Sequence, residues 1–314
     1  MKEPSIIEGR VVRVDARQIE VLIGEETRTV AFLGRVFDNK GEDKCPVAVG
    51  DCIKLRAQGG NLGVESVLER TNVFARRASG EDMRRQLLAA NVDRVVVVAS
   101  FGTPPFSSIT VDRILVSSSF AGIAAAIVLN KTDLSNESEY SKISTTYKQA
   151  GYTVIATSAT EGTGIEELTH LLAKGESVLY GLSGVGKSSL LNCIQPGLGL
   201  KTREVSGALN SGRHATAFAR RWPLEAGGAV IDTPGVRVFR PWGIPPAELR
   251  LHFPEMAELG RECKYPACLH RGEPECAIEK ARKKRAFPES RYRSYAEILA
   301  ELETLYGGTA PVEI

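Results

Sequence analysis

The feature that most constrains the fold is a glycine-rich segment in the second half of the chain, Gly181-Leu182-Ser183-Gly184-Val185-Gly186-Lys187-Ser188. The segment matches the phosphate-loop pattern G-x-x-x-x-G-K-[ST], and it stands between an apolar run, SVLY, and a helix-compatible run, SSLLNCI. In this context backbone N–H groups turn inward around phosphates, and the helix N-terminus adds a favourable dipole. The segment alone predicts a nucleotide-binding α/β domain.

Two side chains of this segment carry specific expectations. We expect Lys187 to reach the β- and γ-phosphates, where it would also stabilise the transferred charge, and Ser188 to ligate Mg²⁺. The nucleotide-contacting residues predicted here are Gly181, Ser183, Gly184, Val185, Gly186, Lys187, Ser188 and Ser189.

A second motif, Asn130-Lys131-Thr132-Asp133, directly follows the apolar run IAAAIVL and indicates which base is read. The Asp133 carboxylate can accept hydrogen bonds from the N1–H and N2–H₂ groups of guanine, and adenine offers no matching donor pair. Asn130 can bond the N7 side and hold the loop, and the stem of Lys131 can cover the base plane. The alternative is an ordinary surface turn, which the phosphate loop in the same chain disfavours.

Two shorter motifs complete the predicted site. Asp232-Thr233-Pro234-Gly235 follows the run AVI, so Asp232 can hold the Mg²⁺ shell and the Gly235 N–H can meet the γ-phosphate. Thr157-Ser158-Ala159 follows the run TVIA, and a backbone N–H at Ser158 or Ala159 can donate to guanine O6. All four motifs follow the C-terminal end of a predicted strand, which is where open α/β sheets bind ligands. They therefore predict one site.

The pattern around these motifs alternates between short apolar runs and helix-compatible segments from about residue 71 to residue 240. This alternation predicts a parallel sheet with helices on both faces. The predicted strands are 95–99, 123–129, 153–156, 177–180 and 229–231, and the predicted helices are 110–120, 138–150, 164–173 and 187–193.

The first 70 residues read differently, as about five short β-branched runs separated by turn residues. Such a pattern favours a small β-barrel of the OB type, with an SH3-like barrel or a sandwich as alternatives.

The C-terminal part combines a cysteine cluster with positive charge. Cys263, Cys268, His270 and Cys276 form a CCHC set, which predicts a closed structural Zn²⁺ site, whereas reduced core cysteines with an incidental histidine are the alternative. The range 261–293 holds ten Lys or Arg and five Asp or Glu, in a chain whose net charge is only +2. This local excess is consistent with RNA phosphate contacts or with a solvated helix face. A helical tail is expected over 294–305.

The order of the motifs is unusual, because the base-reading motif precedes the phosphate loop. A threonine-bearing switch candidate, SGRHATAF, lies between the phosphate loop and the Asp232 motif. The cyclic order of an ordinary GTPase is preserved while its start is moved, which predicts a circularly permuted GTPase. The segment after Asp232 leads into the cysteine-bearing part, so we expect nucleotide state to reach that part by this route.

Taken together, the barrel, the permuted motifs and the CCHC set resemble the RsgA (YjeQ-type) family over nearly the whole chain. The resemblance implies an OB-fold domain, a GTPase domain and a zinc domain. It also implies GTP hydrolysis stimulated by the small ribosomal subunit, and a late role in the maturation of that subunit.

The switch segment departs from the family pattern, which usually reads His-Thr-Thr-Thr, whereas this chain has His214-Ala215-Thr216-Ala217. Thr216 is therefore the expected Mg²⁺ and γ-phosphate ligand, with Thr202 as a weaker competitor. The resemblance suggests that His214 positions the attacking water, since Val236 and not glutamine follows Gly235. A loop histidine that bonds backbone or RNA is the alternative for His214.

These observations lead to a multidomain prediction: an OB-fold RNA-binding domain at 1–70, a permuted GTPase domain at 71–240 and a zinc-binding domain with a basic helical tail at 241–314. The expected ligands and partners are GTP or GDP with Mg²⁺, one Zn²⁺, and the small ribosomal subunit with its rRNA. Apolar stretches reach about eight residues, against the roughly 20 of a membrane span, and the N-terminus lacks the apolar core of a secretory signal. A cytoplasmic monomer is expected. The rivals are a GTP-responsive RNA scaffold with negligible hydrolysis and a permuted GTPase of another particle.

Overall fold

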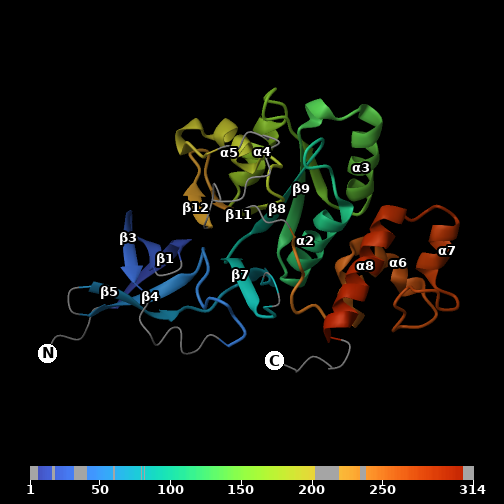
Figure 1. Cartoon of the computed structure of the whole chain (residues 1–314), viewed down its shortest axis with the longest axis horizontal. Helices are drawn as coiled ribbons and strands as arrows, with labels where there is room; N and C mark the ends of the chain where they lie inside the picture. Colours follow the sequence, from blue (N-terminus) through green and yellow to red (C-terminus); the bar gives the residue numbers. More distant parts are fainter. Residues whose placement is uncertain are drawn as a thin grey trace.

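The computed structural model describes residues 6–15, 18–31, 41–58, 61–78, 80, 82–201, 219–233 and 238–306. Three bodies lie next to one another in Figure 1: a blue β-barrel, a central α/β body and an orange-red helical body. The barrel and the helical body sit on different sides of the central body, so each contacts a separate part of it. This arrangement confirms the predicted multidomain fold class.

The first body is a barrel of five strands. They are β1 Ile6–Val14, β2 Gln18–Ile23, β3 Glu26–Ala31, β4 Cys52–Gln58 and β5 Asn61–Val67. The strands pair in the order β1-β2-β3-β5-β4, and β4 pairs back to β1, which closes the barrel. Val11, Ile53 and Leu55 are buried inside it. The OB-like barrel expected from the alternating runs is confirmed.

The second body has a parallel sheet in the order β10-β9-β8-β11-β13. Its strands are β8 Arg94–Ser100, β9 Ala124–Asn130, β10 Thr153–Ala156, β11 Glu176–Tyr180 and β13 Ala229–Asp232. Its helices are α2 Ser108–Phe120, α3 Glu137–Gln149, α4 Ile165–Leu172 and α5 Lys187–Ile194, with short 3₁₀ turns η1 Thr132–Leu134 and η2 Pro196–Leu198. Along β8, Val95 and Val97 face α2 and α3, whereas Val96 and Val98 face α4 and α5. This alternation covers both faces, as predicted.

The edge of this sheet differs from the expectation of a purely parallel sheet. Strand β12, Arg220–Pro223, pairs antiparallel with β13 and on its other side with β1 of the barrel. The two sheets therefore run together as one sheet of 11 strands. The sequence did not indicate β12, because RRWP is short, rich in arginine and without an apolar alternation.

A two-stranded hairpin was also missed. Its strands, β6 Val73–Arg77 and β7 Arg85–Ala90, form a separate sheet between the barrel and the central body. Arginines at the ends of both strands interrupt the apolar–polar alternation that would identify a strand in the sequence. Several of these arginines are buried or half-buried because partners from other segments bind them. Arg85, for example, bonds Asp43 at 2.5 Å and stacks on Trp242 at 4.9 Å.

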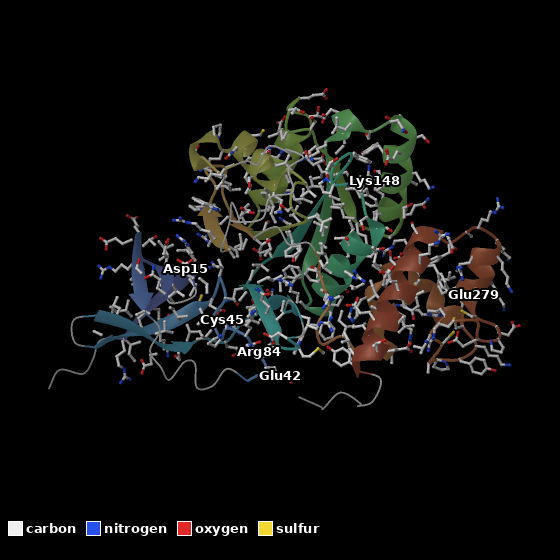
Figure 2. The ribbon with its side chains drawn as sticks, viewed as in Figure 1. Asp15, Glu42, Cys45, Arg84, Lys148 and Glu279 are labelled. Atoms are coloured by element: carbon white, nitrogen blue, oxygen red, sulfur yellow. The ribbon has the colours of Figure 1, made fainter. Side chains whose placement is uncertain are left out.

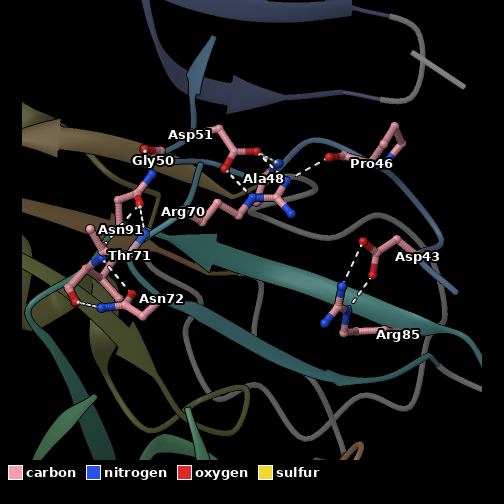
Figure 3. Close-up of polar contacts among 11 residues, drawn as sticks. Asp43, Pro46, Ala48, Gly50, Asp51, Arg70, Thr71, Asn72, Arg85 and Asn91 are labelled. Atoms are coloured by element: carbon pink, nitrogen blue, oxygen red, sulfur yellow. Dashed lines mark hydrogen bonds and ion pairs between the residues drawn. The ribbon is translucent and has the colours of Figure 1, made fainter. Parts of the chain in front are cut away.

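Polar contacts fasten the barrel to this hairpin (Figure 3). Buried Asp51 accepts from Arg70 at 2.7 Å and from the Ala48 N–H at 2.8 Å. Asn91 donates to the Gly50 carbonyl at 3.1 Å and accepts from the Thr71 N–H at 2.8 Å. The Asn91 bond to Gly50 and the Arg85 bond to Asp43 join the barrel segment to the hairpin side, so the barrel has a defined position on the central body.

The third body consists of one long helix and several short ones. They are η3 Pro246–His252, α6 Pro254–Leu259, η4 Gly260–Glu262, α7 Ala277–Lys283 and α8 Glu289–Tyr306. The body packs on α2 mainly through α8, its long helix, and η3. Val116 of α2 is part of its apolar core, together with Phe253 and Ile298. Helix α8 begins at Glu289, earlier than the predicted 294. It does not extend further towards the N-terminus, because Pro288 disfavours the helical conformation of the residue before it. Among the described helices, none has the length and apolar character needed to cross a membrane.

Candidate functional site

The phosphate loop lies between β11 and α5, as its sequence context required. A Cβ atom at Gly181 would lie 2.2 Å from the Val98 carbonyl oxygen. Gly186 has a φ of +97°, and a Cβ there would lie 2.2 Å from Nδ2 of Asn130. Only glycine fits at either position, so the two outer glycines let the loop approach β8 and the base-reading loop closely.

Lys187 is the first residue of α5 and is buried. Its Nζ donates to the Gly181 carbonyl at 2.9 Å and to the Leu182 carbonyl at 3.3 Å, so the ammonium group lies against the concave side of the loop. Burial lowers the pKa of Lys187, although Asp232 opposes this effect. Half-buried Ser188 and Ser189 follow in the first turn of α5. A helix N-terminus with a buried ammonium group attracts an anion.

Asp232 ends β13 and stands beside Leu179 of β11 in the sheet register. It is 2% exposed, and its Oδ1 is buried with no hydrogen-bond partner among the described residues. Burial raises the pKa of Asp232 to about 6, and the nearby Lys187 acts in the opposite direction. A divalent cation nearby would favour the ionised carboxylate. The residue is therefore suited to a cation shell beside the phosphate loop.

Asn130 ends β9 and is buried. Its Nδ2 donates to the Val185 carbonyl at 2.8 Å, and its Oδ1 accepts from the Thr157 hydroxyl at 3.1 Å. Both ends of the amide are thus engaged within the protein, which supports the loop-holding part of the prediction. One side chain joins the base-reading loop, the phosphate loop and the third motif.

Lys131 has a φ of +61° and reaches across the site. Its Nζ donates to the Gly184 carbonyl at 2.7 Å and to the Thr103 carbonyl. Burial lowers the pKa of Lys131, with Asp133 opposing. The Thr103 carbonyl was missed by sequence reasoning. The available signal was its position, since Thr103 also follows the C-terminal end of a strand, β8.

Ser158 contributes more than the backbone N–H that the sequence suggested. Its hydroxyl donates to Oδ1 of Asp133 at 2.6 Å, which orients the carboxylate. Its own N–H donates to the Thr163 carbonyl at 3.1 Å. Because the Ser158 N–H is already bonded, Ala159 remains as the candidate whose N–H would donate to guanine O6.

Several predicted residues lie outside the described part of the chain. These are His214, Thr216 and Gly235, together with the competitor Thr202. Their assigned roles stay predictions.

The four metal-ligand candidates of the third body converge. One ligand atom from each of Cys263, Cys268, His270 and Cys276 lies within 4.8 Å of all the others. The Nδ1 atom of His270 is 3.5 Å from Sγ of Cys276 and 3.7 Å from Sγ of Cys263. Zinc bond lengths of about 2.0–2.3 Å imply tetrahedron edges of about 3.5–3.8 Å. Three thiols and one imidazole at these spacings fit a closed tetrahedral metal site.

The surroundings of this cluster act differently on its thiols and on its imidazole. Burial raises the pKa of Cys268 to about 12 and raises that of Cys276, whereas a bound cation would favour the thiolates. Burial lowers the pKa of His270, which favours the neutral imidazole that binds metals. The Ala277 N–H points at Sγ of Cys263 at 3.3 Å, and the Tyr292 hydroxyl holds the His270 carbonyl at 2.9 Å.

The basic stretch is partly neutralised inside the fold. Arg282 pairs with Glu279 and Glu289 and stacks on the Tyr292 ring at 3.4 Å. Lys280 pairs with Glu275. Within 280–285, the densest part of this stretch, the cations without an ion pair to another described residue are Lys283, Lys284 and Arg285.

Fold and site together define a class: a P-loop GTPase whose motifs are circularly permuted. Two solved structures share this arrangement. YjeQ from Thermotoga maritima is 30% identical with a TM-score of 0.71, and the alignment covers 98% of this chain and 100% of that one. YloQ, described as a circularly permuted GTPase, is 26% identical with a TM-score of 0.68, and covers 98% of each chain.

Sequence relatives agree with the structural ones. The chain matches the family described as RsgA GTPase over residues 67–242. A Chlorobaculum parvum protein named small ribosomal subunit biogenesis GTPase RsgA is 36% identical, over 95% of this chain and 98% of its own length. Small ribosomal subunit biogenesis GTPase RsgA 2 of Bacteroides thetaiotaomicron is 36% identical over 82% and 84%. The chain belongs to the RsgA GTPase family, a family of GTP hydrolases.

Proposed function

We propose that the protein hydrolyses GTP while bound to the small ribosomal subunit and assists a late step in that subunit's maturation. The observation that carries the proposal is the convergence of Asp133, Lys131, Lys187 and Asp232 at one edge of the parallel sheet, in a chain flanked by a barrel and a Cys₃His cluster. The names of the relatives supply the partner.

Each residue of the nucleotide site has a proposed role. Asp133, oriented by Ser158, reads the N1 and N2 donors of guanine, and the Ala159 N–H donates to O6. Lys187 contacts the β- and γ-phosphates. Ser188, Asp232 and Thr216 hold Mg²⁺, which would neutralise phosphate charge during transfer. Gly235 meets the γ-phosphate, and His214 positions water.

The three bodies have proposed boundaries and tasks. Residues 1–70 bind RNA, residues 71–240 form the GTPase domain, and residues 241–314 form a structural zinc domain. Lys283, Lys284 and Arg285 are the cations that this domain offers to rRNA phosphates. A factor that handles assembling ribosomal subunits would act in the cytoplasm.

The test is GTP turnover by the purified protein alone and with small subunits, large subunits or free RNA. We expect slow basal turnover, because no glutamine follows Gly235, and strong stimulation by small subunits only. ATP turnover should be negligible, since adenine leaves the Asp133 carboxylate unpaired.

Each contrary outcome points to a rival. Subunit binding without turnover would indicate a GTP-responsive scaffold, and stimulation by large subunits would indicate another particle. A full stimulated rate in His214→Ala would remove the water-positioning role.

A further inference from the structure

The barrel lies one strand away from the strand that carries Asp232. Arg13 of β1 is the register partner of Arg220 of β12, and Arg220 is the register partner of Asp232 of β13. Neighbouring strands lie about 4.8 Å apart, which places the Arg13 backbone about 10 Å from the Asp232 backbone. A single strand, β12, therefore connects the barrel with the candidate cation site.

Charged side chains reinforce this connection. Glu20 of β2 bonds Arg13 at 3.0 Å and Arg220 at 3.3 Å, so one carboxylate joins the barrel to β12. On the next residue of β12, Arg221 bonds both oxygens of Glu176 at 2.7 and 2.9 Å. We call Arg10, Arg13, Glu20, Glu176, Arg220 and Arg221 the seam; their side chains are 14–38% exposed.

Glu176 of the central body makes the corresponding ionic contacts to the barrel and to β12. It begins β11, the strand that leads into the phosphate loop, and it also faces Arg10 of β1 at 3.5 Å. Asp15, labelled in Figure 2 at the side of the barrel near β12, pairs with Arg13 at 3.2 Å. Strand β11 thus has ionic contacts to both the barrel and β12, whereas β13 is joined to β12 by backbone pairing.

The barrel is a firm support for such contacts. Arg85 and Asn91 bond Asp43 and Gly50 of the barrel segment (Figure 3). The Asn91 carbonyl also accepts from Arg10 of the seam at 3.2 Å, so the barrel is held from the hairpin side as well. Strand β12 then lies between a fixed barrel and β13, so a displacement of β12 changes the seam directly.

We propose that the seam couples the barrel to the nucleotide site: Glu20 and Arg220 are positioning residues that set the place of Asp232 through β12, and RNA bound to the barrel accelerates hydrolysis by this route. The inference rests on the proposed function and adds the regulation of its site. Coupling of binding is reciprocal, so the GTP-bound form should bind the RNA partner more tightly by the same factor that the partner tightens GTP binding.

The experiment uses the full chain with Glu20→Gln, Arg220→Gln, the conservative Arg220→Lys and the double variant Glu20→Gln/Arg220→Gln. The control is Arg28→Gln, which removes an exposed ion pair with Glu26 on β3. Among the described strands, β3 pairs with β2 and β5 and not with β1 or β12. Turnover is measured with and without purified small subunits, and binding to the subunits is measured by co-sedimentation. A partner-free arm measures the Mg²⁺ concentration that gives half-maximal basal turnover.

We expect Glu20→Gln and Arg220→Gln to bind subunits and keep basal turnover at saturating Mg²⁺ within twofold, while their stimulation falls at least tenfold. Arg220→Lys should keep most of the stimulation, and the double variant should be no worse than either single variant. The half-maximal Mg²⁺ concentration should rise about threefold in Arg220→Gln.

Full stimulation in both single variants would overturn the inference, as would an equal loss in Arg28→Gln or a loss explained by failed subunit binding. If the wild type is not stimulated by small subunits, the proposed partner is wrong. In that case the Mg²⁺ measurement alone tests whether the seam positions Asp232. An unchanged half-maximal Mg²⁺ concentration in Arg220→Gln would then overturn the inference.

Discussion

At the scale of single residues, the base-reading loop depends on side chains that orient one another. Asp133 is an exposed residue whose carboxylate is held by the Ser158 hydroxyl, and Asn130 is held between Val185 and Thr157. In the proposed role of Asp133, an oriented acceptor would lose less conformational freedom when guanine binds, so the supporting hydroxyls would contribute to affinity without touching the base.

The first prediction concerns Ser158→Ala. A hydrogen bond to a carboxylate contributes about 1.5–3 kcal/mol. Loss of about 1.4 kcal/mol, close to the lower end of this range, would lower GTP and GDP affinity about tenfold. Titration with a fluorescent guanine nucleotide measures it. Thr146→Ala, which removes an exposed hydroxyl bonded to Lys142 on α3, is the matched control. Equal affinities for both variants would remove the orienting role.

The second prediction compares two glycines with positive φ. Gly50 has a φ of +96°, and a Cβ there would lie 2.1 Å from the Ala90 carbonyl oxygen, whereas Gly24 has a φ of +61° and open space around it. Gly24→Ala should cost only about 1 kcal/mol of left-handed strain. Gly50→Ala adds a backbone clash at the barrel junction and should lower the thermal midpoint much further, as scanning calorimetry would show. Similar midpoints would mean that the junction relaxes freely.

At the scale of elements, short segments form because other segments hold them. The cysteine-bearing stretch between η4 and α7 has few apolar side chains of its own, and Cys268 and Cys276 belong to the apolar core of the third body. A closed metal site would supply folding free energy that this stretch lacks.

The third prediction is therefore that Cys268→Ser lowers bound zinc from one equivalent to near zero and lowers the thermal midpoint of the third body. Elemental analysis and a calorimetric scan measure the two effects, and chelation of the wild type should reproduce the second. Cys52→Ser, on β4 of the barrel, should retain the metal. A wild-type protein that purifies without zinc would contradict the prediction.

At the scale of the whole molecule, a buried charge joins the third body to the central body. Arg291 of α8 is fully buried, pairs with Asp112 of α2 and bonds Glu255 of α6. The Tyr147 hydroxyl of α3 donates to the same Asp112 at 2.9 Å. This network fixes α8 on α2, a helix that packs on β8 and β9 of the central sheet. It would therefore restrain any movement of the third body that accompanies a change of nucleotide.

The fourth prediction is that Arg291→Met destabilises this contact by about 3–5 kcal/mol, because Asp112 becomes a buried unpaired charge. Adding Asp112→Asn should restore part of the loss. Limited proteolysis between the second and third bodies, with thermal midpoints, measures the release of α8. Arg293→Met is the control, since its side chain is 78% exposed, and a comparable effect there would argue against the network.

The sequence by itself determined the parts whose physics is local. Apolar runs predicted the five parallel strands to within two residues, and glycine spacing located the phosphate loop. The cysteine spacing likewise located the Cys₃His cluster, which the structure brings together. The order of the motifs was enough to predict the permutation.

Only the tertiary structure decided what depends on partners far along the chain. No local pattern marks the Ser158 hydroxyl, strand β12 or the buried Arg291. Their roles come from contacts with Asp133, β1 and Asp112, respectively. Hydrophobic periodicity reports which face of an element is buried, whereas a hydrogen bond or an ion pair depends on which groups the fold brings within about 3 Å.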